Sequence, residues 1–127
     1  MSPKNKPTIF VVDDEPTIAS TLAMILNSSG FSATAFTDPM QALRFAEAHC
    51  PDFLISDVMM PKLNGIDLGV QFKAIFPNCR ILLFSGQAAT ADLLESARKE
   101  GHNFNLLTKP VHPKDLLAAL GAIEPTP

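Results

Sequence analysis

The chain has 127 residues, of which 46% are hydrophobic and 18% are charged. Ten Lys and Arg against 13 Asp and Glu give a net charge of −3. This length and balance predict one folded domain and exclude an intrinsically disordered chain. The mild acidity, with no basic cluster beyond Arg98 and Lys99, argues against nucleic acid as a direct ligand.

The sequence also argues against membrane, secretion and disulfide classes. No apolar run approaches the roughly 20 residues that cross a bilayer. Residues 1–7 lack the apolar stretch of a signal peptide. Cys50 and Cys79 lie far apart with no Cys-x-x-Cys pairing, so neither a disulfide framework nor a zinc site is expected, and both are predicted to be small, mostly buried residues. We therefore expect a cytoplasmic protein without a membrane partner.

Short apolar runs alternate with longer stretches of helical periodicity along the chain. The runs that predict strands are residues 9–12, 31–36, 53–55, 81–84 and 104–107. The second is more polar and the fifth is brief, so both suit the edges of a sheet. The five helices between them are opened or ended by Gly30, Asp38-Pro39, Pro77, Gly101 and Pro113.

Five strand–helix units in strict alternation predict an α/β fold with a parallel sheet covered by helices on both faces. In such a sheet, ligands bind at the carboxyl ends of the strands, where the strand order reverses. We expect a flexible arm over residues 1–7, the domain over 8–123, and a tail or the start of a linker over 124–127.

Polar side chains follow four of the five predicted strands. They are Asp13, Asp14, Asp57, Ser85 and Lys109. Taken singly, each has an ordinary interpretation, because acids cap helices, serines occupy turns and lysines lie on surfaces. Their joint placement at one edge of a sheet instead favours a functional site.

These residue types together suit phosphoryl chemistry. Converging carboxylates repel each other unless they bind a cation, and an all-oxygen site suits Mg²⁺ or Mn²⁺. The ammonium group of Lys109 and the hydroxyl of Ser85 suit phosphoryl oxygens. Asp57 is the central carboxylate, and we expect it to be the nucleophile that forms an acyl phosphate.

The chain resembles the receiver domain of two-component response regulators from Thr8 to about Ile123. Four motifs in order carry the resemblance. They are Asp13-Asp14, then Asp57 followed by Met60-Pro61 and Gly65, then Ser85-Gly86, then Lys109-Pro110. The resemblance implies a flavodoxin-like (βα)5 three-layer sandwich with strand order 2-1-3-4-5.

The resemblance also implies residue roles and partners. Mg²⁺ would bind Asp14, Asp57 and the backbone carbonyl of Met59, with Asp13 acting through water. Asp57 would accept phosphate from a sensor histidine kinase or a histidine phosphotransfer protein. The chain would be a regulator that catalyses only its own phosphorylation and dephosphorylation, and Met59 and Gln87 would tune the phosphoryl lifetime.

In this family, signalling is a two-state shift that changes a protein-binding face. Phosphate draws the hydroxyl of Ser85 inward, and an aromatic residue of the fifth strand turns from exposed to buried. The phosphate-binding and switch residues implied here are Ser85, Gly86, Lys109 and Pro110. The face made by the fourth helix, fifth strand and fifth helix then changes its downstream protein partner. The resemblance is also compatible with a homodimer that forms on phosphorylation. Here Leu106 occupies the aromatic position. Either Phe104 substitutes for it, or the output needs no aromatic side chain, and we favour the second.

Two other functions remain as alternatives. One is an aspartyl-nucleophile, Mg²⁺-dependent phosphatase of the haloacid-dehalogenase type, which places Asp-x-Asp after its first strand. Residues 13–17 read Asp-Asp-Glu-Pro-Thr and lack the second acid at that spacing. The other is a receiver-like interaction domain that is never phosphorylated. The sequence is compatible with a stand-alone receiver and with a domain of a longer regulator or hybrid kinase.

Overall fold

Five strands and five helices alternate along the chain in a computed structural model that describes residues 6–86, 90–102, 104–108 and 112–123. The strands are β1 (Thr8–Val12), β2 (Ser32–Phe36), β3 (Phe53–Asp57), β4 (Arg80–Ser85) and β5 (Asn105–Thr108). The helices are α1 (Pro16–Ser28), α2 (Pro39–Ala48), α3 (Gly65–Ile75), α4 (Thr90–Lys99) and α5 (Pro113–Ile123). Among the described residues, no helix has the length and apolarity to span a membrane.

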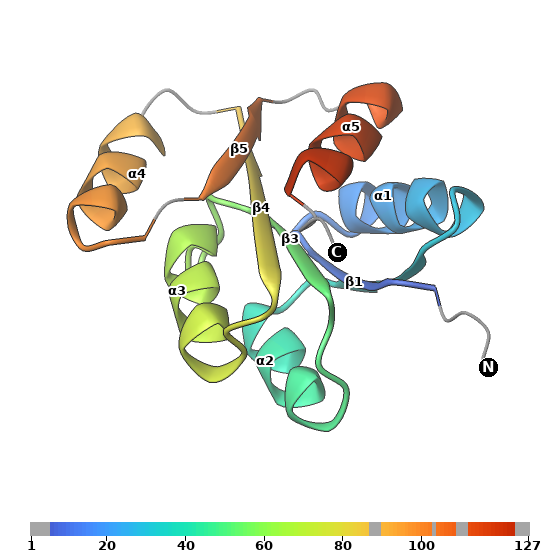
Figure 1. Ribbon diagram of the computed structural model, residues 1–127, viewed down its shortest axis with the longest axis horizontal. Coiled ribbons are helices and arrows are strands. Elements are labelled where there is room, and N and C mark those ends of the chain that lie inside the picture. The colour runs from blue at the N-terminus through green and yellow to red at the C-terminus, as the bar shows by residue number, and fades with distance from the viewer. Residues whose placement is uncertain (1–5, 87–89, 103, 109–111, 124–127) are drawn as a thin grey trace.

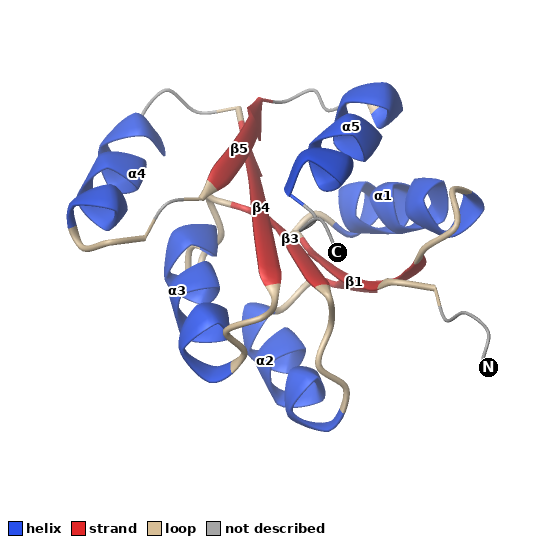
Figure 2. Ribbon diagram, in the orientation of Figure 1, coloured by secondary structure: helices blue, strands red, loops and turns tan. Residues whose placement is uncertain are grey.

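The strands form one parallel sheet in the order β2-β1-β3-β4-β5, which confirms the predicted flavodoxin-like topology. The polar β2 and the short β5 lie at the two edges, as expected. Helices cover both faces of the sheet (Figures 1 and 2). Ile9 and Val11 pack with α1 and α5, whereas the alternate residues Phe10 and Val12 pack with α2, α3 and α4.

Local signals in the sequence explain where several helices begin and end. The Asp38 carboxylate accepts a hydrogen bond of 2.9 Å from the backbone N–H of Met40, and so caps α2. Gly30 follows α1 with φ +97°, and Gly101 follows α4 with φ +94°, a left-handed conformation that glycine adopts readily. These boundaries confirm the helix signals in the sequence.

All five strands differ from the predicted runs by one or two residues at an end: β1, β3 and β4 extend beyond their runs, and β2 and β5 begin one residue later. β2 begins at Ser32 because the N–H of Phe31 donates to the carbonyl of Leu26 and completes the end of α1. β5 runs over Asn105–Thr108 and not over 104–107. Phe104 precedes the strand, and its partly buried ring packs against the core layer of α2, α3 and α4.

The two cysteines have different environments: Cys50 is exposed, and Cys79 is buried at the start of β4. Burial, with a smaller contribution from Cys50, raises the pKa of the Cys79 thiol from 9.0 to about 12. The folded chain therefore retains this proton between pH 9 and about 12, where the unfolded chain loses it. Deprotonation of the unfolded state thus favours unfolding in that range.

We expect the free energy of unfolding of the unaltered chain to fall more steeply above pH 9 than that of Cys79→Ala. Urea unfolding at several alkaline pH values measures the difference. Cys50→Ala is the matched control and retains the steep fall. Equal pH slopes for the unaltered chain and Cys79→Ala would contradict the assignment.

Candidate functional site

Three acidic side chains meet at the carboxyl edge of the sheet. Carboxylate oxygens of Asp13, Asp14 and Asp57 all lie within 4.8 Å of one another. Asp13 is fully buried, Asp57 is 6% exposed, and Asp14 is exposed. The predicted convergence of the acids after the first and third strands is therefore observed.

A tight turn after β1 fixes the first acid of the pair. The backbone N–H of Asp13 donates to the carbonyl of Phe36 at 3.0 Å, which continues the β1–β2 ladder by one residue. The carboxylate of Asp13 accepts from the N–H of Glu15 at 2.8 Å. This local bond turns the chain into α1, which begins at Pro16, and leaves Asp14 at the surface beside the buried acid.

Asp57 is the last residue of β3, and its backbone is held from several sides. It lies opposite Phe84 of β4 in the sheet register. The hydroxyl of Ser56, which is fully buried, donates to the carbonyl of Asp57 at 2.9 Å. The sequence interpretation missed Ser56. The available signal was a polar residue between the apolar run Phe53–Ile55 and Asp57.

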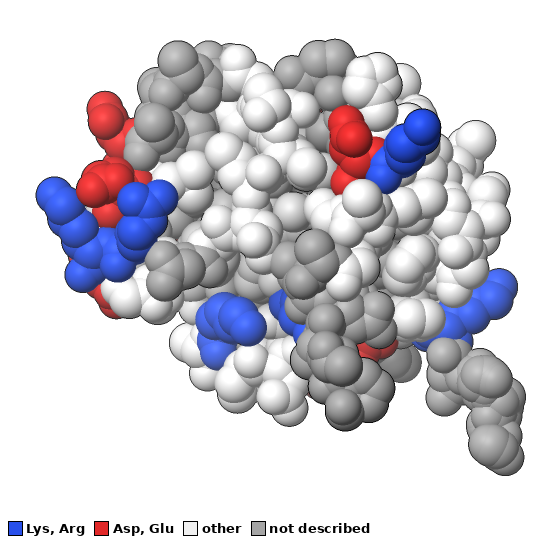
Figure 3. All heavy atoms as spheres, turned by 45° about the horizontal axis from the view of Figure 1, so that its top comes forward, with Lys and Arg blue, Asp and Glu red and all other residues white. Residues whose placement is uncertain are grey.

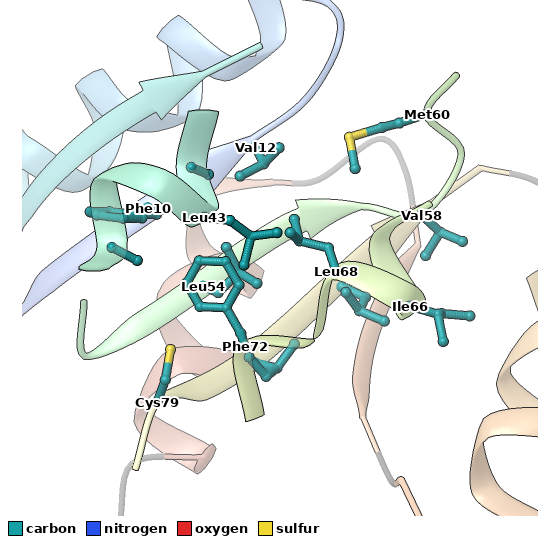
Figure 4. Packing of buried hydrophobic residues seen from close by; sticks show 14 of the residues in the cluster. Phe10, Val12, Leu43, Leu54, Val58, Met60, Ile66, Leu68, Phe72 and Cys79 are labelled. Carbon is teal, nitrogen blue, oxygen red and sulfur yellow. The ribbon is translucent and has the colours of Figure 1, made fainter. Parts of the chain in front are cut away.

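The segment after Asp57 is anchored by alternate side chains. Val58 and Met60 are buried and point into the core cluster that also holds Ile66 of α3 (Figure 4). Met59 between them is 44% exposed. The N–H of Gly65 donates to the carbonyl of Val58 at 2.8 Å, so the loop closes back on itself before α3. The backbone of Met59 lies within this closed loop, two residues after Asp57.

α3 approaches Asp57 as closely as its backbone permits. A Cβ on Gly65 would overlap the carbonyl oxygen of Asp57 and would lie 2.9 Å from its carbonyl carbon and 3.0 Å from the Ser56 hydroxyl. Only glycine fits there without a shift of the backbone. Asn64 caps the same helix by accepting from the N–H of Asp67 at 2.8 Å, a cap that the sequence interpretation also missed.

The hydroxyl expected at the site also lies at this edge. Ser85 is the last residue of β4, the neighbour of β3, and is 4% exposed. Gly86 follows it and is exposed. Thr108 of β5 pairs with Ser85 in the register, so the chain leaves β5 at the same edge. The predicted residues Gln87, Lys109 and Pro110 lie outside the described residues.

The position on β5 where the family has an aromatic switch residue is occupied here by an exposed leucine. Leu106 lies on β5 and is 40% exposed. Phe104 lies on the core side of the same segment. The two residues therefore do not occupy one shared environment, and Phe104 is not a simple replacement shifted along the strand.

The charges at the site repel one another. At 4.8 Å, the repulsion within the buried pair Asp13 and Asp57 is about 3 kcal/mol at an effective dielectric constant near 20. The donor set consists of carboxylate oxygens, which are ligands that Mg²⁺ prefers, and a divalent ion offsets the repulsion. The residues present therefore fit a magnesium ion, to be held by Asp13, Asp14 and Asp57.

Comparison with known proteins gives a family match over nearly the whole chain. The profile described as the response regulator receiver domain matches residues 9–121. The alkaline phosphatase synthesis transcriptional regulatory protein PhoP of Bacillus subtilis is 34% identical over 118 residues, which are 91% of this chain and 47% of that protein. The DNA-binding response regulator MtrA of Mycolicibacterium smegmatis is 31% identical over 114 residues, 90% of this chain and 49% of that protein.

A solved structure agrees with the sequence matches. A response regulator receiver domain protein from Clostridium thermocellum superposes with a TM-score of 0.83 at 32% identity, covering 92% of this chain and 93% of that chain. This chain spans about half the length of the curated relatives that it matches. The match thus concerns only part of each of those relatives.

We expect Gly65→Ala to destabilise the chain by about 1–3 kcal/mol, a typical cost of overpacking. The added methyl group would overlap the backbone of Asp57, which cannot move as a flexible side chain can. Urea unfolding measures the loss. Gly121→Ala in α5 is the matched control, because a Cβ there meets nothing within 4 Å, and it should gain up to about 1 kcal/mol of helix stability. A gain of stability in both variants would refute the close approach of α3.

Proposed function

This chain belongs to the response regulator receiver domain family, and we propose that its Asp57 accepts a phosphoryl group in a Mg²⁺-dependent reaction. The observation that carries the proposal is the burial of Asp57 within 4.8 Å of two further carboxylates at the carboxyl edge of the sheet. The phosphoryl donor would be a sensor histidine kinase or a histidine phosphotransfer protein.

In the proposed reaction, a carboxylate oxygen of Asp57 attacks the phosphorus of a phosphohistidine. A new oxygen–phosphorus bond forms, and the nitrogen–phosphorus bond breaks with its electron pair returning to the donor's imidazole. The protein contributes mainly position, because β3 and α3 fix the backbone of Asp57 from both sides. A magnesium ion, when bound, would neutralise charge on the transferred group.

Each surrounding residue has a proposed role. Asp13 and Asp14 would hold the ion with Asp57, directly or through water, and the backbone carbonyl of Met59 would complete the protein ligands. The hydroxyl of Ser85 would donate to a phosphoryl oxygen from the neighbouring strand, and Lys109 would neutralise another. Met59 and Gln87 would influence how long the phosphoryl group persists, and Gly86 and Pro110 would shape the backbone beside it.

The proposed output is a change in the binding surface formed by α4, β5 and α5. Acidic and basic side chains lie side by side at the left of the surface seen in Figure 3. On α4, Arg98 pairs with Glu95 at 2.9 Å. A charged face of both signs suits a protein partner. The family match favours this regulatory role over the phosphatase alternative, and we propose that the chain catalyses only its own phosphorylation and dephosphorylation.

The expectation that the chain binds no nucleic acid stays a prediction. MtrA is named as a DNA-binding regulator, and this chain aligns with about half of it. The aligned half of MtrA corresponds to the receiver domain. The DNA binding in its name therefore describes that protein and is not transferred to this chain.

We expect Mg²⁺ to raise the melting temperature of the unaltered chain, because binding to the folded state alone stabilises it by about 2.7 kcal/mol at a concentration 100 times Kd. The double variant Asp13→Asn with Asp14→Asn removes two ligands and also the repulsion. It should therefore melt higher than the unaltered chain without Mg²⁺ and respond little to the ion. Potassium chloride at equal ionic strength is the control. The same Mg²⁺ response in both proteins would argue against the site.

Incubation with acetyl phosphate and Mg²⁺ should add one phosphoryl group to the unaltered chain, detected by intact mass. The label should be absent from Asp57→Asn, since the amide is not a nucleophile. Asp92→Asn, which changes an exposed acid of α4, is the matched control and should be labelled normally. Full labelling of Asp57→Asn would overturn the proposal, as would the absence of label from the unaltered chain. Many turnovers of p-nitrophenyl phosphate would instead support the phosphatase alternative.

A further inference from the structure

The ring of Phe104 fills a notch on α3. A Cβ built on Gly69 would lie 3.2 Å from Cζ and 3.3 Å from Cε1 of Phe104, and 3.2 Å from Cγ2 of Ile81. These distances are shorter than ordinary van der Waals contact, so the ring rests where the helix has no side chain. Phe104 therefore packs directly against the backbone of α3.

The segment that carries Phe104 is also attached to the end of α4. The N–H of His102 donates to the carbonyl of Ala97 at 2.9 Å, and Gly101 has the left-handed φ of +94° that ends the helix. The imidazole of His102 stacks on the ring of Phe104, with centroids 6.2 Å apart and an interplanar angle of 6°. A displacement of Phe104 would thus reach the last turn of α4 through a short, bonded segment.

The same face of α3 contacts the phosphoacceptor. Gly65 and Gly69 are four residues apart, so they lie one turn apart on one face of the helix. Gly65 packs on the backbone of Asp57, and Gly69 packs on the ring of Phe104. α3 is thus in close contact with the phosphoacceptor at one turn and with the α4–β5 segment at the next, and α3 and α4 are neighbours in Figure 1.

There is space beside the ring for it to move. A cavity of about 350 Å³ is lined by Lys73, Gly101, His102 and Phe104. The ring fills the notch at Gly69 and cannot move closer to that turn of α3, whereas the cavity, which Lys73 of α3 also lines, leaves open space beside the ring. A shift of α3 towards Phe104 therefore has a direction in which it can be transmitted.

We propose that Phe104 is a positioning residue that couples α3 to α4, so that a phosphoryl group on Asp57 moves the end of α4 through Gly65, Gly69 and the Phe104 ring. This coupling rests on the proposed phosphorylation of Asp57. It passes along the helix that follows the phosphoacceptor and does not need an aromatic side chain at Leu106. The coupling is reciprocal. A substitution that changes the packing of the Phe104 ring against Gly69 therefore also changes the affinity of the site for a phosphoryl analogue.

The test uses Mg²⁺ with beryllofluoride as the phosphoryl analogue and follows two NMR signals. Fluorine signals of bound beryllofluoride report occupancy at Asp57. The imidazole signal of His102, one of three histidines, reports the position of the Phe104 ring through the ring current. In the unaltered chain we expect the His102 signal to shift in proportion to occupancy, and Gly121→Ala should behave identically.

Two variants then separate coupling from simple folding. Gly69→Ala pushes the ring out of the notch, and we expect its beryllofluoride midpoint to change about fivefold, the lower end of usual coupling factors. Phe104→Leu keeps an apolar side chain but loses the ring contact, and the backbone amide shifts of Ala97 and Glu100 on beryllofluoride binding should fall to less than about half.

The outcomes distinguish this inference from the proposed function. If bound beryllofluoride is seen but the His102 signal does not move, the coupling is overturned while Asp57 remains the phosphoacceptor. Unchanged midpoints in Gly69→Ala together with unchanged α4 shifts in Phe104→Leu overturn it as well. If the unaltered chain binds no beryllofluoride, the proposed function fails, and the coupling that rests on it fails with it.

Discussion

The mutual repulsion of three carboxylates at one sheet edge is the constraint on which the rest of this structure depends. The parallel pairing of β1 with β3 forces the residues after Val12 and the last residue of β3 to the same edge. Two of the acids are buried there, which removes them from the water that would otherwise screen them. This repulsion costs free energy that a bound cation offsets, so the fold and the proposed function share one electrostatic requirement.

The surroundings of Asp57 supply the rigidity that this requirement demands. Ser56 and Gly65 hold its carbonyl from two sides, and the buried side chains of Val58 and Met60 fix the loop that follows. Rigidity on one side means that a change at the carboxylate is not absorbed locally. It is passed to α3, whose second glycine meets Phe104, and from there to the end of α4. This connection explains how a receiver with Leu106 on β5 retains a physical link between its site and its charged α4 face.

Much of this arrangement was predictable because it follows from short-range patterns. Buried parallel strands read as continuous apolar runs, and Asp38, Gly30 and Gly101 mark helix ends through their own backbone or side-chain preferences. The acids after two strands and the serine after a third were predicted to converge, since parallel strands all end at one edge. The roles of Gln87, Lys109 and Pro110 remain predictions. The prediction that both cysteines are mostly buried was wrong for Cys50, which lies two residues beyond the end of α2 and is exposed.

The sequence by itself determined the fold class, which two strands lie at the edges of the sheet, and which acids form the cluster. Each of these depends on periodicity or on residues adjacent to a strand end. Only the tertiary structure decided which backbone atoms touch. The contact of Gly65 with the backbone of Asp57 and the packing of Phe104 against Gly69 each join residues from different elements. Such contacts depend on how far α3 sits from the sheet. That distance is set by the packing of every side chain between the two layers and is encoded in no local stretch of the chain.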